Sequence, residues 1–270
     1  MRIVPFAGLA LAGLLLSHTA YAACDTVLSP QVRSIESAGN YCLAANRSAP
    51  IEVRSDNVEI DCRGRTLSRP LDPSGSGTGV LLRGNNLTVR NCRFEGWQFS
   101  VLAEQFLNVQ ILNNTFIPEG PAITVYGSDR PEGDGLRVVG NRVLFYGSQN
   151  GAEQAIGIWH SPRAVLTNNV VAGFMGHAAL QLDRSPDAQL TGNQLLDLNE
   201  GGSVGVDLIF SPRARLVHNT VMLRRGVNAH GLNGASDATC IENILINAVH
   251  SGLEGCVVKR YNLEQISNGD

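Results

Sequence analysis

The sequence contains one lysine, two tryptophans and few aromatic residues overall, which make up 6% of its 270 positions. Its charges are nearly balanced, with a formal net charge of −3. No stripe of basic residues interleaved with aromatic ones occurs. Because proteins that bind nucleic acid need such a basic surface, the sequence predicts no nucleic-acid partner.

Long apolar runs are also scarce. The run from Phe6 to Leu16 is too short to span a bilayer, and the small-residue sequence Ala20-Tyr21-Ala22 follows it. This combination predicts a signal peptide over residues 1–22 and a periplasmic or secreted protein without a transmembrane segment. Residues 23–270 then form one domain. The alternative is a lipoprotein signal in which Cys24 is acylated.

Closely spaced cysteine pairs are absent. No Cys-x-x-Cys occurs, which argues against a zinc site. An even number of cysteines behind an export signal predicts three disulfide bonds. The six cysteines are Cys24, Cys42, Cys62, Cys92, Cys240 and Cys256.

A repeated stretch dominates the rest of the chain. Its clearest copy runs from Ala155 to Val171, and it recurs over residues 179–195 and 205–221. An asparagine near the end of each copy marks the period, with successive gaps of 27, 28, 24, 26 and 24 residues. Such a period is typical of a solenoid. The asparagines are Asn114, Asn141, Asn169, Asn193, Asn219 and Asn243.

Apolar residues alternate within each copy, as in Ile156 and Ile158 or Leu180 and Leu182. A period of two predicts β-strands with one buried face. A helical solenoid is disfavoured because the units are rich in Gly, Asn, Ser and Pro and lack the i, i+3, i+4 pattern. Each unit is therefore one coil of short strands, stacked about 4.8 Å from the next coil.

The recurring asparagine is predicted to be a scaffold residue. Asparagine at a bend tolerates a left-handed backbone conformation. When identical residues stack, each amide can donate to one neighbour and accept from the other. We therefore expect a ladder of side chains here, with no role in chemistry.

The repeat resembles that of the right-handed parallel β-helix proteins of the pectin-lyase-like superfamily. Further similar segments are Gly39 to Leu43, Asn57 to Gly64 and Gly79 to Leu82. The resemblance implies an all-β fold, a single right-handed parallel β-helix of about nine coils with capped ends. The superfamily includes polysaccharide lyases, hydrolases and epimerases, and also proteins without known chemistry.

The coil register narrows the disulfide pairing. Aligning residues 57–60 with residues 86–89 places Cys62 and Cys92 one coil apart and one residue out of register, near bonding range. The other cysteines would staple the terminal coils, as Cys24 with Cys42 and Cys240 with Cys256. This pairing disfavours acylation of Cys24, because it would leave Cys42 without a partner.

A solenoid has two open ends that expose strand edges. Residues 23–50 and 256–270 are expected to cap them, held by the terminal disulfides.

The same register sorts inward from outward positions. One inward column is predicted to comprise Val101, Ile123, Ile156, Leu180, Val206 and His230. Two outward columns follow, Thr124, Gly157, Gln181, Asp207 and Gly231, then Tyr126, Trp159, Asp183, Ile209 and Asn233. His160 and Arg184 come directly after, where the chain bends.

The candidate site lies in these outward columns. Tyr126 and Trp159 are expected to stack on adjacent coils as platforms for sugar rings, with Gln181 as a further substrate-binding residue. Asp183 and Asp207 are diagonal neighbours, about 7–8 Å apart at the backbone. Carboxylates at such separations serve as acid and base in glycoside hydrolysis.

Two further residues complete the predicted catalytic set. His160 or Arg184 could instead accept a proton while carboxylates hold a cation. Calcium is expected only for lyase-like chemistry, and no resident cofactor or other metal is predicted. His177 aligns with Glu153 one coil earlier, and a pair between them would be incidental. The competing interpretation of this face is ordinary solvated residues, or aromatic rings packed under the loop at residues 127–135.

Catalytic signatures of the superfamily are missing. The hydrolase motifs Asn-Thr-Asp, Asp-Asp and Gly-His-Gly and the epimerase motif Asp-Pro-His-Asp do not occur. The repeated Ser-Pro-Arg at residues 161–163 and 211–213 is a turn of the scaffold. With Lys259 as the sole lysine, a lyase with a lysine base is poorly supported.

Two functions are therefore predicted. The first is an exported protein that binds or acts on an extended polysaccharide, as a lyase or hydrolase if it is catalytic. The second is a non-catalytic periplasmic or secreted module for binding or assembly.

Overall fold

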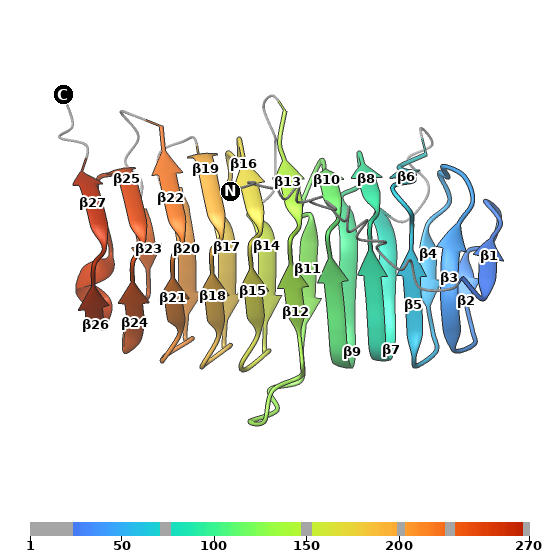
Figure 1. The fold of residues 1–270 in the computed structure, drawn as a ribbon, viewed down its shortest axis with the longest axis horizontal. Coiled ribbons are helices and arrows are strands. Elements are labelled where there is room, and N and C mark those ends of the chain that lie inside the picture. The colour runs from blue at the N-terminus through green and yellow to red at the C-terminus, as the bar shows by residue number, and fades with distance from the viewer. Residues whose placement is uncertain (1–23, 71–76, 147–152, 199–202, 225–229, 267–270) are drawn as a thin grey trace, which may run out of the picture.

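The computed structural model describes residues 24–70, 77–146, 153–198, 203–224 and 230–266. In these segments the chain forms a parallel β-helix, with β1 (Thr26–Leu28) at one end and β27 (Leu263–Ile266) at the other (Figure 1). The predicted signal peptide lies outside the described residues. No helix in the described part is long and apolar enough to cross a membrane.

One wall of the solenoid is a nine-stranded parallel sheet, with one strand from each of nine successive coils. This number agrees with the prediction of about nine coils. Its strands are β6 (Thr66–Ser68), β8 (Arg93–Glu95), β10 (Thr115–Ile117), β13 (Arg142–Leu144), β16 (Val170–Ala172), β19 (Gln194–Leu198), β22 (Thr220–Leu223), β25 (Ile244–Ala248) and β27.

A second sheet of 18 strands forms the other two walls. The strands of each wall stack in one row, which we call a course, and the long strands β7 (Thr78–Arg90) and β9 (Phe99–Leu112) run through both courses. The first course also holds β2 (Ser34–Ile35), β4 (Ile51–Val53), β11 (Ile123–Tyr126), β14 (Gln154–Trp159), β17 (Ala178–Asp183), β20 (Val204–Ile209) and β23 (His230–Asn233). The second holds β1, β3 (Gly39–Leu43), β5 (Val58–Asp61), β12 (Arg137–Val139), β15 (Val165–Thr167), β18 (Gln189–Thr191), β21 (Arg215–Val217), β24 (Ala238–Ile241) and β26 (Cys256–Arg260).

The core is a set of apolar columns, as the alternation predicts. Leu166, Leu190 and Leu216 lie in register on successive coils and are fully buried. Aromatic rings stack in the same way, with the ring centroids of Phe94 and Phe116 5.0 Å apart. Each coil thus buries its apolar face against its neighbours.

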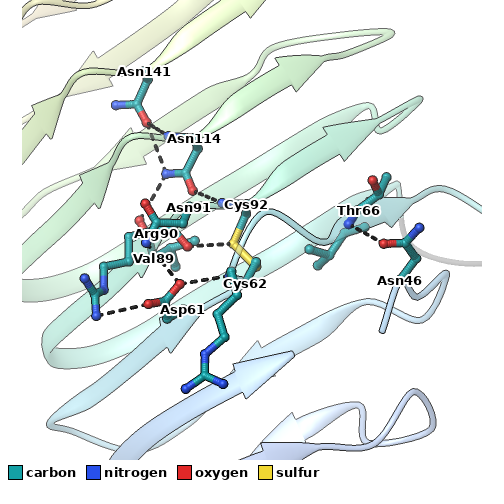
Figure 2. The surroundings of a disulfide bond; sticks show 12 residues. Asn46, Asp61, Cys62, Thr66, Val89, Arg90, Asn91, Cys92, Asn114 and Asn141 are labelled. Carbon is teal, nitrogen blue, oxygen red and sulfur yellow. Dashed lines mark hydrogen bonds and ion pairs between the residues drawn. A yellow bond between two sulfur atoms is a disulfide. The ribbon is translucent and has the colours of Figure 1, made fainter. Parts of the chain in front are cut away.

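The predicted asparagine ladder is present and longer than predicted. In each step, the backbone N–H and Nδ2 of one asparagine donate to Oδ1 of the next, at 3.0 and 3.0 Å from Asn169 to Asn193. The ladder begins at the backbone N–H of Cys92 and ends at Asn262 (Figure 2 shows its first steps). All six predicted asparagines are at most 2% exposed.

The left-handed residue is not the ladder asparagine itself, contrary to the prediction. It is the residue before it, for example Asn113, Asn168 or His218, with φ of 54°, 54° and 56°. The bend turns at this exposed position, and the asparagine that follows can point its amide inward along the stack.

The three predicted disulfides form. Cys24 joins Cys42, Cys62 joins Cys92 and Cys240 joins Cys256, with Cα–Cα distances of 5.8, 4.7 and 6.0 Å. The bond between Cys62 and Cys92 stands where the asparagine ladder starts (Figure 2). No described cysteine is free.

The terminal segments continue the parallel ladders. At the C-terminal end, Lys259 pairs with Cys240 and Glu264 with Leu245, so that charged residues take positions in the two inward columns. Both charged residues are exposed. The last described coil therefore ends the apolar core with charge.

The predicted inward column that begins at Val101 is wrong at its last member, His230. Val206 pairs with Leu232, and His230 pairs with Val204, two residues earlier. The reason is the length of the strand: β20 has six residues and β23 has four. The offset given by the ladder asparagine therefore holds for β24, where Thr239 pairs with Arg215, but it misplaces the residues of β23 by two, including Gly231 and Asn233.

Candidate functional site

The candidate site lies on the outward face of β11, β14, β17 and β20, which we call the platform face. Tyr126 pairs in register with Trp159, and Trp159 with Asp183. As predicted, the two aromatic rings stack, with centroids 5.1 Å apart and planes inclined by 26°. Tyr126 is 44% exposed, so no described loop covers it.

Gly157 positions the tryptophan. A Cβ atom at this glycine would lie 2.3 Å from Cη2 of Trp159, so the indole lies against the glycine backbone. Stacking on Tyr126 occupies one face of the indole. Since the coils follow one another along the axis, the opposite face is directed towards the coil that carries Gln181 and Asp183.

Several buried polar atoms on the platform face have no hydrogen-bond partner within the described residues. They are Thr124 Oγ1, Gln154 Oε1 and Asp183 Oδ1. A Cβ at Gly157 would also approach Cγ of Gln154, so Gln154 borders the indole. Buried acceptors without a partner are costly, which is why such atoms call for an explanation such as a ligand or a water molecule.

Asp207 faces outward as predicted, but it is not solvated. It is 1% exposed, and two side chains cover it. Nδ2 of Asn233 donates to Oδ1 at 2.8 Å, and Nε2 of His177 lies 3.1 Å from Oδ2. The carboxylate is therefore held in place and shielded from water.

His177 has a partner that the sequence did not predict. Its backbone neighbour Ala178 donates to the carbonyl of Glu153, so the predicted alignment is correct. Its imidazole, however, turns to Asp207 on the following coil, and about half of the side chain stays exposed. If Nε2 donates to the carboxylate, Nδ1 is left as an acceptor open to solvent.

The other two predicted catalytic residues lie around the bend. Nδ1 of His160 is 2.6 Å from Oδ2 of Asp129, and both His160 and Arg184 have left-handed backbones. Arg184 and Asp129 line a separate cavity of about 450 Å³ with the exposed Phe210. The predicted set of four is thus divided between this cavity and the platform face.

Charges are strongly paired on both sides of the platform face. On the N-terminal side, Arg83 binds Glu52 and Glu104, and Glu104 pairs in register with Tyr126. Hydrogen bonding to Arg54 holds the pKa of Glu52 below its ordinary value. In the cavity around Phe210, Arg213 similarly lowers the pKa of Asp187 by hydrogen bonding. These carboxylates are fixed as partners of arginines.

Metal binding has no preformed centre in the described segments. No group of three or more His, Cys, Asp or Glu side chains there is arranged to hold a metal ion.

The comparison with known families agrees with this architecture. The model described as "right handed beta helix region" matches residues 78–245, more than half of the chain. The protein therefore belongs to this right-handed β-helix family. No curated protein matches the sequence significantly.

Proposed function

We propose that this protein is exported and binds an extended polysaccharide along the platform face. The observation that supports this most is the stack of the exposed Tyr126 on Trp159, with the partly exposed side chains of Gln181 and Asp183 on the next coil. An aromatic face packs against the C–H groups of a sugar, and the outward amide and carboxylate can hydrogen-bond to its hydroxyls.

The direction of the ligand follows from the register. Equivalent outward residues recur on each coil, about 4.8 Å apart along the axis. A polymer laid along the axis would meet Trp159, then Gln181 and Asp183, then the side chains over Asp207. Three disulfides suit a protein that works in an oxidising compartment, in accord with a periplasmic or secreted location.

A second candidate function, cleavage of the bound polysaccharide, is favoured by the pair of His177 and Asp207. A buried carboxylate that holds a partly exposed imidazole is the arrangement by which enzymes orient a general base. In this hypothesis His177 accepts a proton from the substrate or donates one to it, and Asp207 holds the imidazole of His177 in position. Asp183 supplies the other carboxyl group that faces the substrate. The roles of His160 and Arg184 stay predictions: Arg184 lines the separate cavity around Phe210, and His160 contacts Asp129 of its lining.

Binding is tested by affinity electrophoresis of the exported protein, with disulfides intact, through gels containing polyuronates or neutral polysaccharides. We expect retardation by at least one polymer, and Trp159→Ala should lose most of it. Leu102→Ala, in the same outward column as Gly157 but two coils away, serves as the matched control. Equal retardation of the Trp159→Ala variant and the wild type would place the ligand elsewhere.

Cleavage is tested with each polymer that retards the protein. New reducing ends and unsaturated products are measured with and without calcium. His177→Gln should abolish turnover and leave retardation unchanged. Retention without turnover would favour a binding module. Absence of both would favour the assembly module that the sequence also predicts.

A further inference from the structure

A second cavity opens where the platform face ends. It has a volume of about 380 Å³, and its lining includes His230, Asn233, Ser236, His250 and Glu254. We call it the end pocket. The shortness of β23 creates the space, because the chain turns away at Gly234, which has φ of 66°.

The end pocket lies at the C-terminal end of the row of strands that carries the platform face. Beyond β23, the described part of this course continues as a bridge between His230 and His250, with backbone hydrogen bonds from Gly231 to His250 and from Leu232 to Ser251. The chain then enters the short 3-10 helix η1 (Leu253–Gly255), and Glu254 and Gly255 of this turn line the pocket. A ligand that follows the face towards the C-terminal end would therefore end at this wall.

Two imidazoles form one side of the end pocket. The rings of His230 and His250 stack, with centroids 4.8 Å apart and planes inclined by 29°. A neutral imidazole offers one donor and one acceptor, so that the pair presents both kinds of group. Ser236 and Asn233 add further donors and acceptors, and Leu232 and Ala235 add apolar surface.

This chemistry selects among ligand classes. The Glu254 carboxylate in the wall opposes an anion. A metal ion is disfavoured because no cluster of three ligating side chains occurs among the described residues. Mixed donors and acceptors beside a substantial apolar wall suit a neutral ring that carries hydroxyl groups on an apolar face, such as one sugar unit.

The pocket also connects to the platform face through a single residue. Asn233 lines the pocket and its amide donates to Asp207, the carboxylate that holds His177. We propose that the end pocket binds the terminal, neutral sugar unit of the polysaccharide and so makes recognition depend on a chain end. This inference rests on the proposed function of the platform face.

The test follows the histidine ring signals of the exported protein by NMR while neutral monosaccharides are added. The probes are glucose, galactose, mannose, xylose, arabinose, rhamnose, fucose, N-acetylglucosamine and N-acetylgalactosamine. We expect one or more of them to shift the signals of His230 and His250, assigned with His230→Asn and His250→Asn. Ser236→Trp, which fills the pocket from an exposed position, should abolish the shift.

Thr239→Trp adds the same ring to the same coil outside the pocket lining and should leave the shift unchanged. If none of the nine sugars moves either histidine signal, or if the Ser236→Trp variant responds like the wild type, the pocket is not a sugar site. Trp159→Ala separates the two proposals, because it impairs polymer retention but should not alter the response to monosaccharides.

Discussion

Each asparagine of the ladder satisfies several buried groups at once. Oδ1 of Asn193 accepts from the backbone N–H and Nδ2 of Asn169, and its own Nδ2 donates to the carbonyl of Leu166 and to Asn219. Asn193 is fully buried, so a shorter side chain would leave these groups without a partner. Because an unsatisfied buried group costs about 1–3 kcal/mol, the amide matters more than its size suggests.

Asn193→Ala should therefore lower the free energy of unfolding by at least about 1–3 kcal/mol, the cost of a single group left unsatisfied. Chemical denaturation followed by circular dichroism would measure this. Gln194→Ala removes the adjacent exposed amide and should change the stability far less. Equal effects of the two substitutions would show that the ladder contributes no more than a surface amide.

The ion pair of Asp187 with Arg213 predicts a pH dependence at the residue scale. Because Arg213 lowers the pKa of Asp187, its contribution to stability is present above the unfolded value, about 3.9, and is lost as the pH falls through the folded value. Asp187→Asn should thus reduce the unfolding temperature at pH 7, and the difference should shrink in acid.

Asp237→Asn is the matched control for this ion pair. Its backbone is also left-handed, with φ of 60° against 59° at Asp187, and asparagine tolerates this conformation. Asp237 makes no hydrogen bond or ion pair with the described residues, and it acts on Arg213 only through a weaker, longer-range attraction, so its substitution should change the unfolding temperature less. A difference for Asp187→Asn that persisted unchanged in acid would exclude the ion pair as its cause.

At the scale of the strand, Gly157 in β14 determines where the indole of Trp159 lies. Gly157→Ala would place Cβ 2.3 Å from Cη2, so the ring must move away from the strand. We expect a changed tryptophan fluorescence spectrum and weaker polysaccharide retention. The other tryptophan, Trp97, is fully buried and hydrogen-bonded to the carbonyl of Leu67, so its emission should serve as a constant background.

Leu102→Ala lies in the same outward column and should leave both readouts of the Gly157 experiment unchanged. Retention that survives Gly157→Ala in full, although the fluorescence changes, would separate the position of the ring from binding.

Strand elements show what the sequence can and cannot predict. Alternating apolar residues and the recurring asparagine predict the coils, the ladder and the disulfide between Cys62 and Cys92, because parallel stacking repeats the same contacts in every coil. The other two disulfides are predicted as staples of the terminal coils. The pairing of His177 with Asp207 was not predictable from columns, because it joins residues out of register on successive coils. The placement of His230 failed for a local reason, the two-residue difference between β20 and β23.

At the scale of the whole molecule, we expect the last described coil to discourage stacking on another copy. Lys259 and Glu264 take the inward positions of the last coil, a known way to protect an exposed strand edge. Lys259→Leu with Glu264→Val would extend the apolar columns to the end. We expect this double variant to associate at concentrations where the wild type shows less association, as measured by sedimentation velocity.

Arg260→Leu with Gln265→Val adds a similar apolar area to the same strands, in the columns of Ile241 and Ile246 next to the inward ones. Association should stay near the wild-type level in this control. If both double variants associate equally, added hydrophobicity alone is responsible and the inward charges have no special role.

The parallel register also makes the molecule a ruler. Backbone hydrogen bonds between the strands fix the spacing of successive coils at about 4.8 Å, and this spacing does not depend on the side chains. The strand that carries Trp159 and the strand that lines the end pocket are three coil steps apart, so a polymer that touches both must span that distance. Gain or loss of one complete coil between them would retune the preferred ligand length by one step and leave both contact points intact.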